Sequence, residues 1–226
     1  MPESSFSEPR DTFRNGFNGG SALNASDGIA ALAIVNTNVA AAAGMLTWLV
    51  LDAIEGKAST VGAMTGAVVG LVAITPAAGF VRPLSSLVFG FAGSVASFYS
   101  IKYLKRGIAD TLDAFFCHGV AGFVGTVLVG LFAELSMNPL GNDGAFFSSE
   151  TGGKLLGEQI MAAIVVAAWS FSFTYVFLTI CKYVPFIGLR PSEEHEDAGL
   201  DNSIHMVKAY ASDGETKDLE MSSNDL

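Results

Sequence analysis

Long apolar runs separated by short polar links dominate the chain. A helix needs about 20 apolar residues to cross a hydrocarbon core of about 30 Å, because each residue adds about 1.5 Å. Five stretches meet this requirement, at approximately residues 28–53, 60–80, 84–104, 111–133 and 158–181. The links between them hold turn-forming residues such as Gly56, Pro83 and Pro139. The pattern predicts an all-α membrane protein, a helix bundle of about five transmembrane helices.

The composition supports this prediction. Hydrophobic residues make up 50% of the 226 residues and charged residues only 15%, against about 25% charged residues in a typical soluble domain. With only 12 lysines and arginines and a net charge of -10, the chain is not expected to bind nucleic acid, which requires clustered cations. Two cysteines cannot form a disulfide framework.

The charge is concentrated at one end of the chain. Residues 191–226 hold ten acids against Lys208 and Lys217, and so carry -8 of the -10. The first fifteen residues are polar and lack the apolar region of a secretory signal peptide. The sequence therefore divides into a polar segment at 1–15, a transmembrane domain at 16–190 and an acidic tail at 191–226.

Cations near the ends of the apolar runs predict the orientation, because cytoplasmic loops carry an excess of lysine and arginine. The tail side holds six cations, namely Lys57, Lys102, Lys105, Arg106, Lys182 and Arg190. The opposite side holds four, namely Arg10, Arg14, Arg82 and Lys154. We expect an integral protein, with the plasma membrane as its site, an external N-terminal side and a cytoplasmic C-terminus.

Glycines repeat at helical spacing in two of the apolar runs. Gly62, Gly66 and Gly70 recur every four residues, and Gly119, Gly122 and Gly125 recur every three. Small residues on one face let the backbones of two membrane helices approach closely. Both sets predict tight packing in a bundle.

Ionisable residues inside apolar runs are functional candidates, because burying a charge in lipid is costly. His118 is the only histidine within a predicted span, and it either lines a pathway or forms a structural hydrogen bond with a neighbouring helix. Asp110 and Asp113 precede it at the start of the same run. They either cap the helix or take part in function.

Other chemistry has less support in the sequence. A zinc site needs three or four ligands, and Cys117 and His118 are the only candidates within the spans. These two are adjacent, so they project from different sides of a helix. We therefore expect no metal site and no cofactor. A nucleophile with a suitably spaced base is absent from the pattern, so we do not expect an enzyme. Asn36, Thr37 and Asn38 either line a channel or bond across helices.

Four segments of the chain resemble the ammonium transporter (Amt/Mep/Rh) family. The four segments follow the family's order over about residues 16–210. The first comprises 16–22, 30–33 and 35–37, the second 70–79 and the third 110–120. The fourth lies in the tail region and comprises 188–190, 193–194, 199–201 and 209–210. The resemblance implies an eleven-helix bundle of two inverted repeats, usually a homotrimer with one pore per subunit. The chain matches the end of the sixth helix, the seventh to tenth helices and the long eleventh helix.

The resemblance also implies roles for individual residues. His118 corresponds to the second of two pore histidines, and Phe17 corresponds to one phenylalanine of the gate above the pore. Ser21 corresponds to the hydroxyl of the external ammonium recruitment site, and Asp110 to the acid eight residues before the histidine. In such a pore, aromatic faces stabilise the cation and an apolar conduit then favours its deprotonation.

The function expected from this resemblance is transport of ammonium or ammonia across the lipid bilayer. The residues matching the first repeat are not in the sequence, so we expect the chain to act as part of a full-length or oligomeric transporter, in a homo- or hetero-trimer. The alternative is a truncated, non-transporting partner that joins and regulates trimers of full-length transporters. A cytosolic regulator could act on the tail, where serines such as Ser203 and Ser212 lie among acids; the competing interpretation is a solvated end without such a role.

Overall fold

The computed structural model describes residues 15–56, 58–108, 110, 112–184, 191, 192, 195 and 199. The polar segment before residue 15 and the expectations for Lys57, Arg190 and the serines of the tail therefore lie outside the described residues. The chain divides into two compact units, Met1–Ala167 and Ala168–Leu226, and each unit is described by itself.

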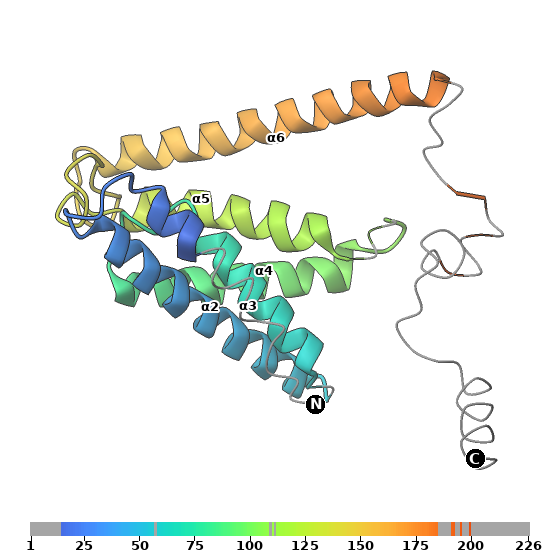
Figure 1. Cartoon of the computed structure of the whole chain (residues 1–226), viewed down its shortest axis with the longest axis horizontal. Coiled ribbons are helices and arrows are strands. Elements are labelled where there is room, and N and C mark those ends of the chain that lie inside the picture. Colours follow the sequence, from blue (N-terminus) through green and yellow to red (C-terminus); the bar gives the residue numbers. More distant parts are fainter. Residues whose placement is uncertain are drawn as a thin grey trace, which may run out of the picture. The chain divides into compact units, whose positions relative to one another are not determined.

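Every regular element of the described residues is helical (Figure 1). A short helical segment at 15–20 comes first. The later elements are α2 (Ile29–Ile54), α3 (Thr60–Ile74), α4 (Pro83–Leu104), the π-helix η2 (Phe115–Val120) that continues as α5 (Ala121–Phe132), and α6 (Gly152–Tyr183). The fold class expected from the sequence, an all-α membrane protein, is confirmed.

The helices agree with four of the five expected spans. Among the described residues, α2, α4, the continuous η2–α5 helix and α6 are long and apolar enough to cross a membrane. The expected span at 60–80 is shorter, because α3 ends at Ile74 after 15 residues. Pro76 lacks the N–H that would continue the helix, and the Thr75 N–H instead donates to the Val72 carbonyl. Turns follow as far as Phe80.

Local chemistry sets where the helices begin. The Ser59 hydroxyl accepts a hydrogen bond from the Gly62 N–H at 2.9 Å, which satisfies one of the unpaired donors at the start of α3. Pro83 begins α4, where its missing N–H has no intrahelical partner to lose. The Asp27 carboxylate accepts from the Ile29 N–H at 3.0 Å at the start of α2.

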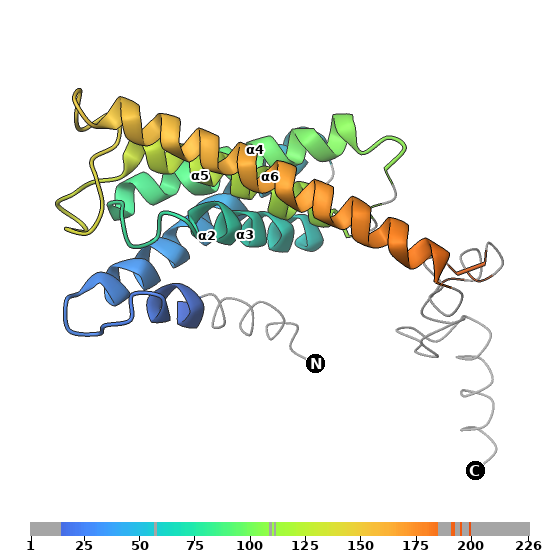
Figure 2. The same cartoon turned by 90° about the horizontal axis from the view of Figure 1, so that it is seen from above.

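Glycines bring the helices of the first unit into backbone contact. Helix α2 packs against α3 and α4, and Figure 2 shows α2 and α3 side by side. The Ala40 carbonyl of α2 lies against both Gly70 of α3 and Gly90 of α4, and a Cβ atom at either glycine would overlap its oxygen. The expected tight packing is thus found for Gly62, Gly66 and Gly70, whereas in the second set it is found only at Gly125, against Ala73.

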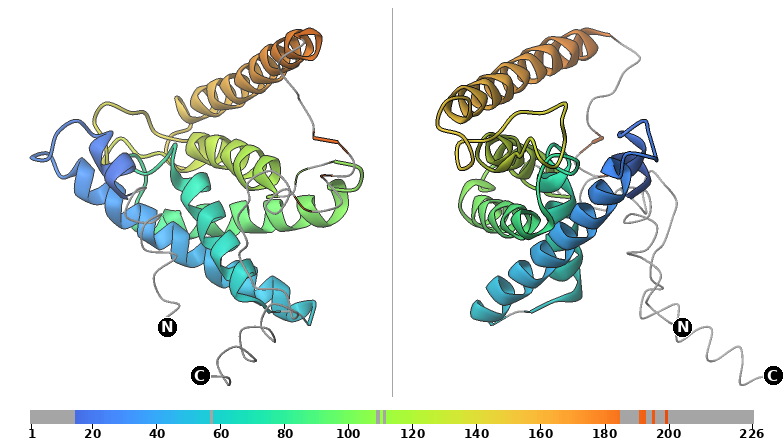
Figure 3. Two further views of the ribbon diagram at one scale, coloured as in Figure 1. Left: turned by 45° about the vertical axis from the view of Figure 1, so that its right-hand side comes forward. Right: turned by 90° about the vertical axis from the view of Figure 1, so that its left-hand side faces the viewer.

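Ion pairs join helices at both ends of the first unit. At one end Lys102 of α4 pairs with Glu55, just after α2. At the other end the Arg82 guanidinium, just before α4, lies 2.5 Å from Oε2 of Glu134, which follows α5. The loop joining α5 to α6 begins there (Figure 3, left), and its Asp143 carboxylate accepts a hydrogen bond from the Leu135 N–H at 2.7 Å.

The long helix α6 extends through the boundary between the two units. Its first half lies in the first unit, where Leu155 packs against the core and the Cα of Leu156 lies against Gly130. Its second half carries stacked aromatic rings spaced four residues apart, in the pairs Trp169–Phe173, Phe173–Phe177 and Phe171–Tyr175. With 32 residues the helix is about 48 Å long, which exceeds the hydrocarbon core of a bilayer.

Candidate functional site

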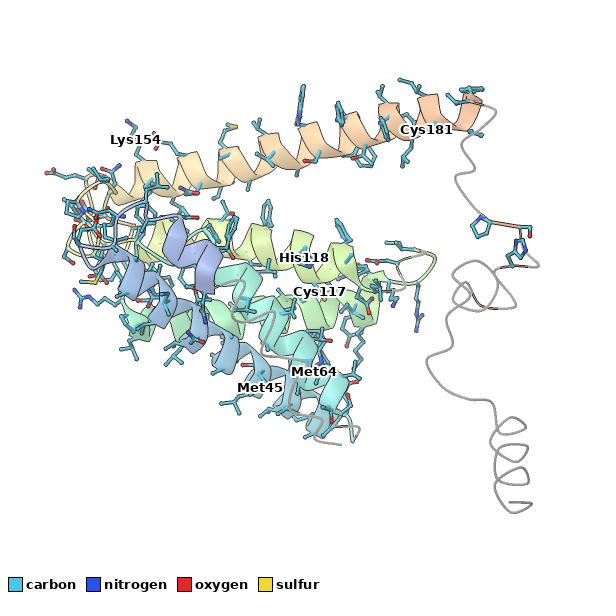
Figure 4. All side chains as sticks on the ribbon, viewed as in Figure 1. Met45, Met64, Cys117, His118, Lys154 and Cys181 are labelled. Carbon is cyan, nitrogen blue, oxygen red and sulfur yellow. The ribbon has the colours of Figure 1, made fainter. Side chains whose placement is uncertain are left out.

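His118 lies in a six-residue π-helix within a membrane-spanning helix. In a π-helix each N–H donates to the carbonyl five residues earlier rather than four, and such turns are frequent at functional sites. In η2 the side chains of Phe116 and Cys117 are buried, whereas His118 and Phe115 are exposed. Figure 4 shows Cys117 and His118 on this segment. The imidazole therefore lies on the exposed side of the π-turn, away from the face where Phe116 and Cys117 are packed.

Asp110 caps the helix that carries His118. Its Oδ1 accepts a hydrogen bond from the Ala114 N–H and its Oδ2 accepts one from the Phe115 N–H, both at 2.9 Å. Two of the donors that a helix start leaves unpaired are thereby satisfied. Of the two interpretations open for Asp110, the structure provides the contacts for capping.

Asp113 has different contacts. Its Oδ1 lies 2.7 Å from the Lys105 ammonium, which follows α4. Its backbone has φ 54°, in the left-handed region that aspartate tolerates better than most residues. The Asp113 carbonyl accepts a hydrogen bond from the Cys117 N–H at 2.8 Å. Asp113 thus links the end of α4 to the first turn of η2 through an ion pair rather than through a side-chain cap.

Phe17 and Ser21 lie together at the first described helical segment. The Ser21 hydroxyl donates to the Phe17 carbonyl at 2.8 Å, which leaves the lone pairs of the Ser21 oxygen to accept hydrogen bonds. The Phe17 side chain is 54% exposed. This segment is joined to α2 by the Asn18 amide, which donates to the Thr37 hydroxyl at 2.9 Å.

The polar residues of α2 bond to neighbouring segments. The amide of Asn36 donates to the carbonyls of Ala78 and Val81, both at 2.7 Å, and so ties α2 to the link between α3 and α4. Asn36 and Thr37 are fully buried. Asn38 is exposed, and its amide donates to the Asn15 side chain at 3.1 Å. Of the two interpretations from the sequence, bonding between segments has direct contacts for all three residues.

The structure places the candidate residues in two groups. Asp110, Asp113 and His118 follow one another at the start of the η2–α5 helix, and Phe17 and Ser21 accompany α2. Within the described part of the chain no three His, Cys, Asp or Glu side chains are grouped to hold a metal ion. Sequence reasoning missed the Lys105–Asp113 pair and the buried serines of α4, Ser94 and Ser97, although their three-residue spacing in an apolar run was a usable signal.

The cap at Asp110 gives a first prediction. Asp110→Ala removes both bonds to the helix start, and we expect it to lower the free energy of unfolding by about 1–2 kcal/mol. Asp110→Asn keeps one acceptor oxygen, so we expect about half that loss. Thermal unfolding in detergent measures both changes, with the matched exchange Asp143→Asn as a control for the lost charge. Equal losses for Asp110→Asn and Asp110→Ala would contradict a capping role.

Comparisons with known proteins identify the family of this membrane-spanning helix bundle. The model of the Ammonium Transporter Family matches residues 13–210. An ammonium transporter of Bacillus subtilis is 44% identical over an alignment of 198 residues that covers 86% of this chain and 48% of the relative. Ammonium transporter 1 of Dictyostelium discoideum is 38% identical over 197 residues, covering 86% of this chain and 41% of the relative.

A solved structure gives the same result. The crystal structure of Candida albicans Mep2 superposes with a TM-score of 0.76 at 37% identity, over 84% of this chain and 42% of that chain. The chain belongs to the ammonium transporter family, and it is an integral membrane protein. It spans less than half of the length of each of these relatives.

Proposed function

We propose that the chain takes part in the transport of ammonium or ammonia across a membrane, through a hydrophobic pore lined in part by His118. The observation that carries this proposal is the exposed imidazole in a π-turn of an apolar, membrane-spanning helix. An imidazole has one donor and one acceptor when neutral, so it can hydrogen-bond ammonia along a path that disfavours charge.

The other candidate residues fit successive steps of this function. The exposed Phe17 ring offers a π-face that attracts a cation, and the Ser21 oxygen offers lone pairs to an N–H donor. Beyond them, an apolar conduit raises the cost of the charged form. Ammonium then transfers its proton to water at the external entrance, which becomes hydronium, and His118 receives the neutral ammonia that enters the conduit. Asp110 and Asp113 support the helix that carries His118.

Expression in cells that lack their own ammonium transporters tests this proposal. Because the chain spans less than half of its relatives, uptake is measured both for the chain alone and for a chimera that places the remaining part of the Bacillus subtilis relative before it. The variants are made in whichever of these two proteins, the chain alone or the chimera, takes up ammonium. We expect His118→Ala to lower its uptake about tenfold, because the loss of one hydrogen bond worth about 1.4 kcal/mol corresponds to a factor of ten. Thr126→Val, on the same helix, serves as the matched control. Unchanged uptake in His118→Ala would refute the role of His118.

The assembly and orientation belong to the same proposal. We propose a homo- or hetero-trimer in the plasma membrane, with a cytoplasmic C-terminus and a tail open to a cytosolic regulator. Lys102 and Lys105 at the end of α4 support this orientation under the positive-inside rule. Protease treatment checks the side on which the tail lies. We expect the tail to be protected in sealed cells and digested after the cells are permeabilised.

A second candidate function is a regulatory partner that does not transport. The exposure of His118 favours it, because a second chain could pack against the exposed side of the helix that carries the imidazole. Co-purification with a full-length family member distinguishes the two functions. Association together with altered uptake by that member supports the partner, whereas uptake by this chain without association refutes it.

A further inference from the structure

The direction of the His118 side chain depends on the register of η2. One turn of a π-helix holds more residues than one turn of an α-helix, and each α-helical residue advances the side chains by about 100°. A change from π to α geometry at η2 would therefore turn the side chains around its axis. The contacts that favour the π-turn determine where the imidazole lies.

One such contact comes from the neighbouring helix α4. The Ser97 hydroxyl donates a hydrogen bond to the Phe116 carbonyl oxygen, inside η2, at 2.9 Å. Ser97 and Phe116 are both fully buried, so water cannot replace this donor. The bond fixes a peptide group two residues before His118. In a low-dielectric interior, a buried carbonyl that loses its donor is costly.

The same helix holds a matched residue whose hydroxyl bonds to α2 rather than to η2. Ser94 lies three residues earlier on α4 and is also fully buried. Its hydroxyl donates to the Gly44 carbonyl of α2 at 3.1 Å. Both serines are fully buried and both donate to a backbone carbonyl. They differ in the helix that carries this carbonyl, which is α2 for Ser94 and η2 for Ser97. A comparison of their variants therefore separates an effect on η2 from a general loss of packing.

We propose that Ser97 is a positioning residue for His118, acting through the Phe116 carbonyl to hold the π-turn of η2. Its relevance to transport rests on the conduction role proposed for His118 above. Without the Ser97 hydroxyl, η2 relaxes toward α-helical register and the imidazole turns away from its position.

A spectroscopic experiment tests the positioning without reference to transport. The full chain is prepared with ¹⁵N-histidine in detergent micelles, and the ring signals of His118 are assigned by their loss in His118→Gln. We expect Ser97→Ala to shift these signals and Ser94→Ala to leave them near their original positions. An unshifted His118 signal in Ser97→Ala, or an equal shift in Ser94→Ala, overturns the proposal.

A second variant keeps the proposal testable if Ser97→Ala does not fold. Ser97→Cys keeps the shape of the side chain, with a somewhat larger atom and a weaker donor. We expect it to shift the His118 signals in the same direction as Ser97→Ala, by a smaller amount. A folded Ser97→Cys protein with unshifted His118 signals would also overturn the proposal.

Uptake measurements separate failure of this inference from failure of the proposed function. The same variants are made in the protein that takes up ammonium, either the chain alone or the chimera. We expect Ser97→Ala to lower uptake and to change the pH profile of uptake in the same direction as His118→Ala. Combined with His118→Ala, it should add no further loss, whereas the loss from Ser94→Ala should add. Full uptake in His118→Ala refutes the proposed function, and the ring signals then still decide the positioning role. Additive losses from Ser97→Ala and His118→Ala refute the coupling.

Discussion

Gly70→Leu is expected to prevent the helix bundle from folding. A Cβ atom at Gly70 would overlap the carbonyl oxygen of Ala40, and the Ala40 residue is fully buried between α3 and α4. That carbonyl also lies against Gly90 of α4, so α2 meets both neighbouring helices at backbone distance at this point. Overpacking of this kind costs about 1–3 kcal/mol for a few added atoms. We expect the larger leucine side chain to exceed this range.

A smaller change at the same position gives a measurable variant. We expect Gly70→Ala to lower the free energy of unfolding by about 1–3 kcal/mol. Gly122→Ala is the matched control, because a Cβ atom there would meet only Val72 Cγ1 at an ordinary 3.8 Å. In a helix, alanine is favoured over glycine by roughly 0.5–1 kcal/mol, so this control should be neutral or stabilising. Denaturant titration in detergent compares the two. Equal stability of the two variants would show that close backbone approach at Gly70 is unimportant.

Arg82→Met is expected to destabilise the first unit by about 3 kcal/mol, the lower end of the cost of breaking a buried ion pair. The Glu134 side chain is only 2% exposed, whereas the Arg82 side chain is 57% exposed and lies over the Phe147 ring. Among the described residues, Oε1 of Glu134 has no hydrogen-bond partner. Loss of the guanidinium would leave a buried carboxylate without its compensating charge.

Two further variants separate charge burial from lost contacts. Lys154→Met removes an ion pair with Glu158 in which both side chains are exposed, at 81% and 59%, so we expect a change within about 0.5 kcal/mol. Arg82→Met combined with Glu134→Gln removes the buried charge as well, and we expect it to recover much of the stability. Thermal unfolding in detergent measures all three proteins. A loss in Arg82→Met no greater than that in Lys154→Met would refute the importance of the pair.

Much of the bundle could be predicted from the pattern of apolar residues. The runs at 28–53, 84–104, 111–133 and 158–181 each overlap a helix that is long and apolar enough to span a membrane. Hydropathy succeeds here because a spanning helix satisfies its own backbone hydrogen bonds, so its length follows from the thickness of the bilayer. It failed at the end of α3, where the run continues through Pro76 but the helix does not.

The candidate site was only partly predictable. The sequence singled out His118 as an ionisable residue in an apolar run, and it offered capping as one role for Asp110. The structure supplies that cap through the N–H groups of Ala114 and Phe115, four and five residues later. Asp113 differs, because its backbone is left-handed and its carboxylate reaches Lys105. Local sequence could not distinguish the two acids, since both precede the same helix.

The sequence by itself determined the membrane-spanning class, the family motifs and the chemistry available at each position, because these depend on residue type and local spacing. Only the tertiary structure decided which donor meets which acceptor. Ser97 and Phe116 are 19 residues apart, and Asn36 and Ala78 are 42 apart, yet each pair shares a buried hydrogen bond. Such pairs form when helices pack at backbone distance, and the position of a buried donor then follows from the neighbouring helix rather than from its own.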